Sequence, residues 1–218
     1  MDKAFDRFMH RFGLPVSRMA ASSKSIEKYR GKLPDQLLQY WEKYGFCGFK
    51  DGLFWIVNPD DYEDALDAWI GDTPAMEEDA YYVIARSAFG ALYLWGKKTG
   101  YKYKVNSSIG WIIDMGDSSE KIAIEGENKV LGSFFYCQQP KYTDEVDQND
   151  LALFDRCIEK FGPLNEDECF GFVPALFAGG ENTIDHIQKL NIFTHLSILA
   201  QLADRQIMDT NALIKTAF

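Results

Sequence analysis

Four short aromatic and β-branched segments lie between Tyr81 and Asp114, and Gly or Asn residues separate them. Segments of this length and composition, divided by turn residues, are typical of neighbouring antiparallel strands. Tyr and Lys alternate in the third segment, which predicts one covered and one solvated face. The pattern therefore predicts a β-meander at the centre of the fold. The segments are YYVIARS (81–87), ALYLWG (91–96), YKYKVN (101–106) and GWIID (110–114).

Apolar residues recur at helical spacing on both sides of the meander. The segments with this spacing are 5–12, 37–44, 62–70, 151–161 and 184–202. Asn58 followed by Pro59 predicts a capped helix start before the third of them. Residues 122–124 and 130–131 read as two further short strands, with Gly126 in a charged turn between them. The fold class is therefore α+β, a central antiparallel β-meander flanked by N-terminal and C-terminal helices.

The chain has 218 residues, of which 46% are hydrophobic and 15% aromatic, so it can bury a core and wholesale disorder is excluded. The polar stretch 138–150, with one Pro, is the best candidate in the sequence for a boundary between two regions. A boundary there divides the chain into an α+β region over residues 1–139 and a helical region over 140–218. The second region packs on the first, as a separate domain or as part of one compact unit.

Neither a signal peptide nor a membrane span is expected, because no apolar run approaches 18 residues and the first residues carry many charges. The four cysteines lack the spacing of a disulfide scaffold and predict reduced thiols in a cytoplasmic protein. A zinc site built from Cys157, Cys169 and either His186 or His195 is an alternative, although zinc ligands usually come in close pairs. We expect no metal and no cofactor.

The formal net charge is −10, and it comes from one part of the chain. Residues 51–85, the first acidic stretch, hold ten acidic residues and no Lys or Arg, so the rest of the chain is balanced. Binding to nucleic acid or anionic lipid needs surplus positive charge, which this chain lacks. Helix capping accounts for Asp60 and Asp61. The negative electrostatic field of the other acidic residues in this stretch predicts a basic protein partner.

One pattern favours catalysis instead. Glu127 and Lys129, preceded by Asp114 and Asp117, resemble the acid-x-Lys arrangement of metal-dependent nucleases, in which carboxylates hold a divalent ion. The other interpretation of these residues is a charged hairpin. The sequence contains no P-loop, no GxSxG motif and no HExxH motif.

Two longer runs resemble known domains. Residues 33–70, LPDQLLQYWEKYGFCGFKDGLFWIVNPDDYEDALDAWI, resemble a GAD-like domain in their Leu-Pro helix, Tyr-Gly turn and Gly-Leu-Phe-Trp segment before Asn-Pro. Residues 161–202, FGPLNEDECFGFVPALFAGGENTIDHIQKLNIFTHLSILAQL, resemble the domain that usually follows it. That domain forms the C-terminal part of immunity proteins that protect against DNase effectors of the type VI secretion system. The resemblance implies a cytoplasmic antitoxin that binds a cognate nuclease toxin stoichiometrically, with no catalytic residues.

Together with the net negative charge, this resemblance predicts that the protein covers the DNA-binding or active-site surface of its toxin. The protein is not expected to bind nucleic acid itself. We expect the contacts in the first acidic stretch, with a second candidate in residues 144–168, the second acidic stretch, which holds nine acidic residues. The candidate toxin-binding residues are Asp64, Asp67, Asp72, Glu77, Glu78, Asp79, Asp144, Glu145 and Asp147. Two alternatives stay open: a metal-dependent enzyme acting on nucleic acid or nucleotides through Asp114, Glu127 and Lys129, and a small-ligand-binding regulatory module. The second alternative places an aromatic pocket between the meander and the last helix.

Overall fold

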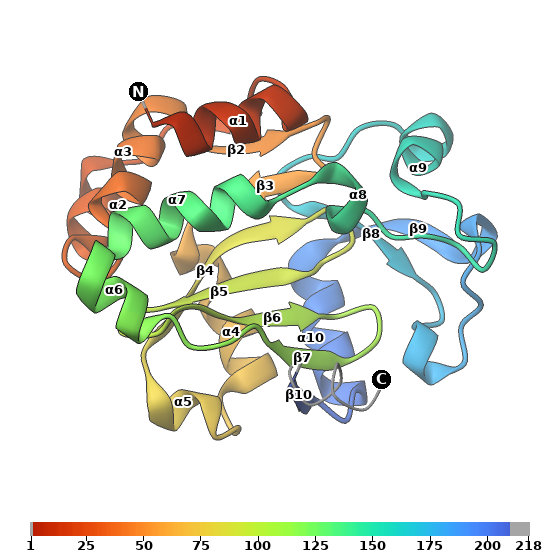
Figure 1. Cartoon of the computed structure of the whole chain (residues 1–218). Coiled ribbons are helices and arrows are strands. Elements are labelled where there is room, and N and C mark those ends of the chain that lie inside the picture. The colour runs from red at the N-terminus through yellow and green to blue at the C-terminus, as the bar shows by residue number, and fades with distance from the viewer. Residues whose placement is uncertain (1, 210–218) are drawn as a thin grey trace.

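Eight strands form one sheet in the order β1-β2-β3-β4-β5-β6-β7-β10, which runs through the middle of the molecule (Figure 1). The computed structural model describes residues 2–209. All neighbouring strands are antiparallel except β10, which pairs in parallel with β7. The strands are β1 (Val16–Met19), β2 (Phe46–Phe49), β3 (Phe54–Ile56), β4 (Tyr81–Ser87), β5 (Leu92–Gly96), β6 (Gly100–Asn106), β7 (Trp111–Asp114) and β10 (Gln206–Asp209).

The predicted meander is confirmed, because β4 to β7 occupy the four segments between Tyr81 and Asp114. The predicted solvated face of β6 is wrong. Lys102 and Lys104 are only partly exposed, and Lys104 lies over the ring of Tyr93 at 5.5 Å. The reason is that helices cover both faces of the sheet, so the alternating lysines lie under other elements.

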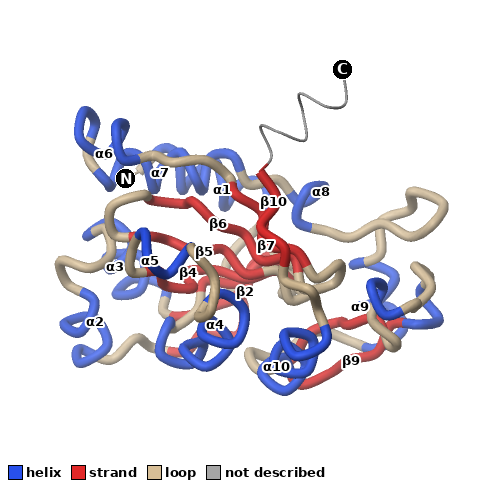
Figure 2. Tube along the Cα trace, turned by 90° about the horizontal axis from the view of Figure 1, so that it is seen from below, coloured by secondary structure: helices blue, strands red, loops and turns tan. Residues whose placement is uncertain are grey.

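Two helical layers enclose the sheet, as the view from below shows (Figure 2). Helices α1 and α7 lie on one face, while α4 and α10 pack together on the other. The helices are α1 (Lys3–Phe12), α2 (Ser23–Tyr29), α3 (Asp35–Tyr44), α4 (Glu63–Ile70), α5 (Ala75–Glu78), α6 (Ser119–Glu125), α7 (Glu127–Cys137), α8 (Pro140–Thr143), α9 (Phe154–Phe161) and α10 (Ile192–Leu202). Three 3₁₀ turns complete them: η1 (Pro59–Tyr62), η2 (Leu176–Ala178) and η3 (Ile184–His186).

Aromatic rings fill the space between the first layer and the sheet. Phe8 of α1 meets Phe54 of β3 edge to face at 5.2 Å, and Phe5 meets Phe135 of α7 at 5.0 Å. These rings are buried, and each such pair stabilises the fold by about 0.5–1.5 kcal/mol beyond its area burial. The phenylalanine spacing that predicted the first helix thus also supplies the residues that hold it on the sheet.

The expected strands at 122–124 and 130–131 are wrong, because both segments are helical. Gly126, at φ +84°, joins α6 to α7 rather than turning a hairpin. Val130 and Leu131 precede Phe134 and Phe135 by three to five positions, and all four are buried. The short apolar segments are therefore parts of helices. The strand prediction was wrong because it considered too few residues to show the helical spacing.

The C-terminal part is not only helical. Strands β8 (Glu168–Phe172) and β9 (Ile187–Asn191) form a separate two-stranded sheet, with Cys169 opposite Leu190. The last long helix therefore begins at Ile192, not at residue 184, because cross-strand pairing with β8 overrides the helical spacing of 187–191. Asn191 caps it by accepting the backbone N–H of Thr194. The elements without a counterpart among the predicted ones include helices α2, α5 and α8 and strands β1, β2 and β10.

The proposed division at residue 139 stays a prediction. Helix α7 lies N-terminal to that point, and strand β10 lies C-terminal to it, yet both belong to the layers of the main sheet. The part of the predicted C-terminal region beyond residue 209 lies outside the described residues.

Gly13 and Gly45 form a matched pair for testing the fold. Both end a helix, with φ +80° and +77° and ψ −171° and −170°, in a region of backbone space that is nearly exclusive to glycine. A Cβ at residue 13 would meet nothing within 4 Å, whereas one at residue 45 would lie 2.1 Å from the carbonyl oxygen of Met19.

We therefore expect Gly13→Ala to lower the free energy of unfolding by about 1–3 kcal/mol, the cost of the backbone conformation alone. Gly45→Ala should cost at least about 2 kcal/mol more, since β1 must also move away. Urea unfolding followed by tryptophan fluorescence measures both values. Equal losses would show that the contact between Gly45 and β1 has no energetic weight.

Candidate functional site

The helical part of the first acidic stretch is η1, α4 and α5, and α4 lies on the side of the sheet opposite α1 and α7 (Figure 2). Pro59 at the first position of η1 and the Asn58 side chain, which accepts the backbone N–H of Asp60, start this segment as predicted. Helix α4 then buries Ala65, Trp69 and Ile70. This leaves Asp64 and Asp67 on its exposed side.

Cations from distant parts of the chain neutralise much of this stretch. Lys28 of α2 forms ion pairs with Asp60 and Glu63. Lys102 of β6 lies 2.5 Å from Glu78, which also accepts the hydroxyl of Tyr103 at 3.1 Å.

Near the C-terminal end, the guanidinium of Arg205 donates to both carboxylate oxygens of Asp72, at 2.6 and 2.8 Å. This exposed pair lowers the pKa of Asp72. Basic residues from other elements thus partly compensate for the lack of Lys and Arg within residues 51–85. Asp72 and Glu78 in particular have partners within the molecule.

Asp79 is not a surface residue. Its side chain is 8% exposed, and Oδ2 accepts the backbone N–H groups of Lys98 and Thr99 at 2.6 and 2.9 Å, together with the hydroxyl of Thr99 at 3.0 Å. The carboxylate therefore fixes the turn between β5 and β6. The structure removes Asp79 from the residues that a partner could reach.

Five predicted residues are exposed. Asp72 and Glu78 have the partners just described, and the other three are Asp64, Asp67 and Glu77. Their carboxylates make no hydrogen bond or ion pair with any residue between 2 and 209. We call these three residues the α4–α5 surface. Of the predicted toxin-binding residues in the first acidic stretch, these three carry charges that no cation of the described chain neutralises.

The three candidates in the second acidic stretch are held inside a loop. Asp144 accepts the backbone N–H of Phe154 at 2.9 Å at the start of α9, and burial raises the pKa of Asp144 to about 6. Burial also raises the pKa of Glu145. Asp147 is 6% exposed and bonds the guanidinium of Arg156 at 2.6 Å. These residues organise the loop before α9, and Asp147 in particular lies away from solvent.

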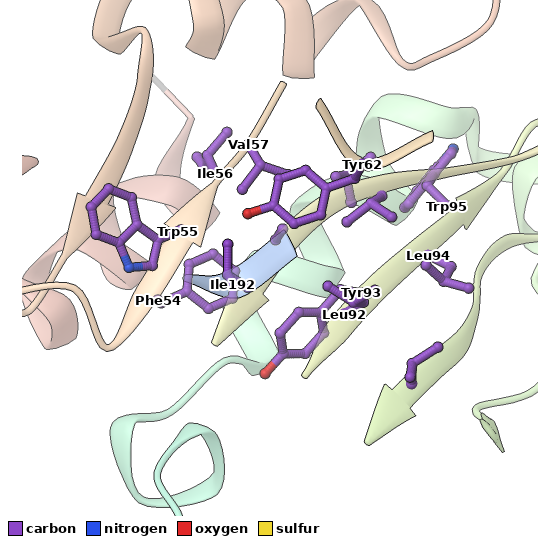
Figure 3. Packing of buried hydrophobic residues seen from close by; sticks show 14 of the residues in the cluster. Phe54, Trp55, Ile56, Val57, Tyr62, Leu92, Tyr93, Leu94, Trp95 and Ile192 are labelled. Atoms are coloured by element: carbon purple, nitrogen blue, oxygen red, sulfur yellow. The ribbon is translucent and has the colours of Figure 1, made fainter. Parts of the chain in front are cut away.

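Other acidic residues of both stretches meet at one cavity of about 330 Å³, which we call the junction cavity. Its walls include the apolar residues Phe46, Trp55 and Phe193 and the acidic residues Asp61, Glu166 and Asp167. Figure 3 shows Trp55 and Ile56 of β3, the following Val57, and Tyr62 near them. These acidic residues belong to the two acidic stretches identified in the sequence. No sequence pattern indicated that residues 61 and 166–167 lie together.

The cavity differs in place from the expected aromatic pocket. That pocket was expected between the meander and the last helix. Phe193 does come from α10, but the other wall is β2, β3 and η1 rather than β4 to β7. Partial burial raises the pKa of Asp61.

The residues of the catalytic alternative do not form a cluster that could hold a metal. Asp117 accepts the backbone N–H of Ser119 at the start of α6, and Lys129 pairs with Glu125 at 3.3 Å. Glu127 lies in the first turn of α7, whereas Asp114 is the last residue of β7. Within residues 2–209, no three His, Cys, Asp or Glu side chains are grouped as metal ligands would be.

The same holds for the alternative zinc ligands. Cys157 and Cys169 are buried free thiols, and burial raises the pKa of each to about 12. His186 ends η3, whereas His195 lies in α10, where burial lowers its pKa to about 4. The two histidines therefore do not share a continuous helix. All four cysteines are free, and Cys137 is the exposed one.

Asp79 and Glu77 allow a direct test of this assignment. We expect Asp79→Ala to lower the free energy of unfolding by about 2–4 kcal/mol, because two buried N–H groups and a hydroxyl lose a charged acceptor. Glu77→Ala, two residues away and exposed, should change it by less than about 0.5 kcal/mol. Urea titrations of both variants provide the measurement. A neutral Asp79→Ala would return this residue to the candidate surface.

No helix within residues 2–209 combines the length and the apolar character needed to cross a bilayer.

Comparison with solved structures gives a fold match across nearly the whole chain. The crystal structure of Atu4351 from Agrobacterium tumefaciens superposes with a TM-score of 0.83, covering 94% of this chain and 92% of the other. Sequence identity is 20%, so the likeness concerns the fold. A search of curated proteins gives no match.

Family models match two regions. Residues 3–109 match the GAD-like domain, and residues 129–203 match the C-terminal domain of the type VI secretion immunity protein Tdi1. Both motif runs found in the sequence fall inside these matches, in the same order. The chain therefore belongs to the family of type VI secretion immunity proteins in which a GAD-like domain precedes a Tdi1 C-terminal domain.

Proposed function

We propose that this protein binds a cognate nuclease toxin in the bacterial cytoplasm and neutralises it by covering its DNA-binding or active-site surface. The Tdi1-type C-terminal domain supports an immunity role. The exposed, unpaired carboxylates of the α4–α5 surface support the more specific proposal that the toxin is a nuclease. Inhibition is by stoichiometric binding without turnover.

The physical argument rests on the substrate of the toxin. A nuclease must present positive charge to the phosphate backbone of DNA. An acidic protein surface is complementary to that charge and attracts it from a distance. Asp64, Asp67 and Glu77 suit this role because no cation of the described chain neutralises them. A net charge of −10 adds a favourable long-range field.

Charge reversal tests the surface. The combined Asp64→Lys, Asp67→Lys and Glu77→Lys variant should weaken binding of the toxin by about tenfold or more, since attraction becomes repulsion. The thermal midpoint should stay nearly unchanged, because the three side chains have no structural partner. Calorimetric titration with the catalytically inactivated product of a neighbouring toxin gene gives the affinity.

The control carries the same charge change elsewhere. Glu27, Glu42 and Glu120 are exposed on α2, α3 and α6, and replacing all three by Lys alters the net charge equally. This variant should bind the toxin within about threefold of wild type. Equal weakening by both triple variants would assign the effect to net charge and remove the α4–α5 surface from the account.

Ionic strength gives an independent test of the attraction. The association rate constant of the wild-type protein should fall by about tenfold or more between low salt and about 0.5 M salt, because screening shortens the reach of the field. The triple Lys variant of the α4–α5 surface should show a flatter dependence. Stopped-flow mixing measures both. A wild-type rate that does not change with salt would contradict electrostatic steering.

A further inference from the structure

The junction cavity lies where the two regions matched by family models meet. Its Asp61 belongs to the first acidic stretch and the GAD-like region, while Glu166 and Asp167 belong to the second stretch and the Tdi1-type region. Residues more than 100 positions apart thus contribute carboxylates to one opening. No Lys or Arg among residues 2–209 lines it.

The walls combine two kinds of chemistry. Phe46, Val57 and Trp55 are almost fully buried and supply apolar surface, and Phe193 is partly covered. The three acidic side chains are exposed and lie at the mouth. Lys and Arg have this same division, with an apolar stem and a charged head. Arg also stacks on aromatic rings and binds carboxylates through two parallel hydrogen bonds.

Tyr62 also lines the cavity and is 2% exposed, and in Figure 3 its hydroxyl end is turned toward the Trp55 side of β3. The guanidinium of Arg86 acts on this hydroxyl and opposes the rise in its pKa that burial causes. The hydroxyl therefore faces a cation inside the fold, and Tyr62 gives the cavity its aromatic ring as wall.

The carboxylates are not counter-ions of the nearby buried Arg86. Its guanidinium lies over the Trp55 ring at 4.5 Å and donates to the carbonyl oxygens of Ser87 and Glu166, at 3.2 and 2.9 Å. Arg86 does not line the cavity. Neither Asp61 nor Glu166 forms an ion pair with it or with another cation between residues 2 and 209.

We propose that the junction cavity receives one basic side chain of the toxin, an Arg by preference, with its stem between the aromatic residues and its charged head among Asp61, Glu166 and Asp167. This inference rests on the proposed function and names its main contact. The volume of about 330 Å³ lies near the lower end of ligand pockets, which suits one long side chain better than a nucleotide or cofactor.

The cavity and the α4–α5 surface act on different steps. Exposed charges mainly change the rate of association, whereas a side chain buried in a pocket mainly changes the rate of dissociation. A basic side chain enclosed by aromatic residues is also the usual chemistry of an interface residue that contributes most of the affinity. The two sites can therefore be separated by kinetics.

The test compares two isosteric triple variants with equal loss of charge. The first, Asp61→Asn, Glu166→Gln and Asp167→Asn, removes the carboxylates of the cavity. The second, Asp64→Asn, Asp67→Asn and Glu77→Gln, removes those of the α4–α5 surface. Surface plasmon resonance with the inactivated toxin gives both rate constants, and thermal unfolding checks each fold. The single Asp61→Asn variant replaces the first triple if that triple is destabilised.

The first variant should speed dissociation by about tenfold or more with little change in association. The second should mainly slow association. A cavity variant with wild-type dissociation would overturn the cavity proposal and leave the proposed function intact, provided that the wild-type protein binds and inhibits the toxin. A wild-type protein that does not bind the toxin would overturn both.

A double-mutant cycle then identifies the inserted residue. Exposed Arg and Lys residues of the toxin are replaced singly by Ala and measured against wild type and Asp61→Asn. One position should lose about tenfold in affinity against wild type and much less against Asp61→Asn, which shows coupling between the two side chains. Additive losses at every position would contradict insertion of a basic residue beside Asp61.

Discussion

The stack of Trp55 on Arg86 connects the parts of this molecule. The two residues are opposite each other on β3 and β4, so the guanidinium lies over the indole at 4.5 Å. Gly48 and Gly52 leave room for the ring, since a Cβ at either position would come within 3.1 Å of it. Arg86 then binds the carbonyl oxygen of Glu166. One interaction thus sets the β2–β3 packing and holds the loop that borders the junction cavity.

The charge of the protein is organised by the same tertiary structure. In the sequence, residues 51–85 hold acids alone, but Lys28, Lys102 and Arg205 approach them from other elements. Of the acids without such partners, Asp79 is buried and Asp51 lies in the turn after β2. Asp64, Asp67 and Glu77 form the α4–α5 surface, and Asp61 lies at the mouth of the junction cavity. Intramolecular ion pairing therefore selects, from a uniformly acidic stretch, the carboxylates that are available to a partner.

Periodicity and turn residues predicted the central meander and the helices that begin or end at Pro, Asn or Gly, such as those ending at Gly13 and Gly45. They failed where pairing decides the structure. Residues 187–191 have helical spacing but form a strand because β8 lies beside them. Val130 and Leu131 looked like a strand because Phe134 and Phe135, which complete the helical stripe, were left out of the window.

The candidate site was predictable only in part, for a related reason. Acidic composition located both stretches, yet exposure of a carboxylate depends on contacts that the sequence does not list. Asp79 is buried by the β5–β6 turn, and Asp147 is held by Arg156. The meeting of Asp61 with Glu166 and Asp167 depends on how the C-terminal part lies against β3, which no local pattern encodes.

The parallel pairing of β10 with β7 affects how proteins of this kind diversify. Strand β10, near the C-terminal limit of the described residues, extends the sheet that the GAD-like region begins, and the adjoining Arg205 binds Asp72. Recombination that exchanges C-terminal halves between relatives must therefore preserve the register of this strand pair and the nearby ion pair. Under the proposed function, point substitutions at the exposed carboxylates would change toxin specificity without disturbing this strand pair.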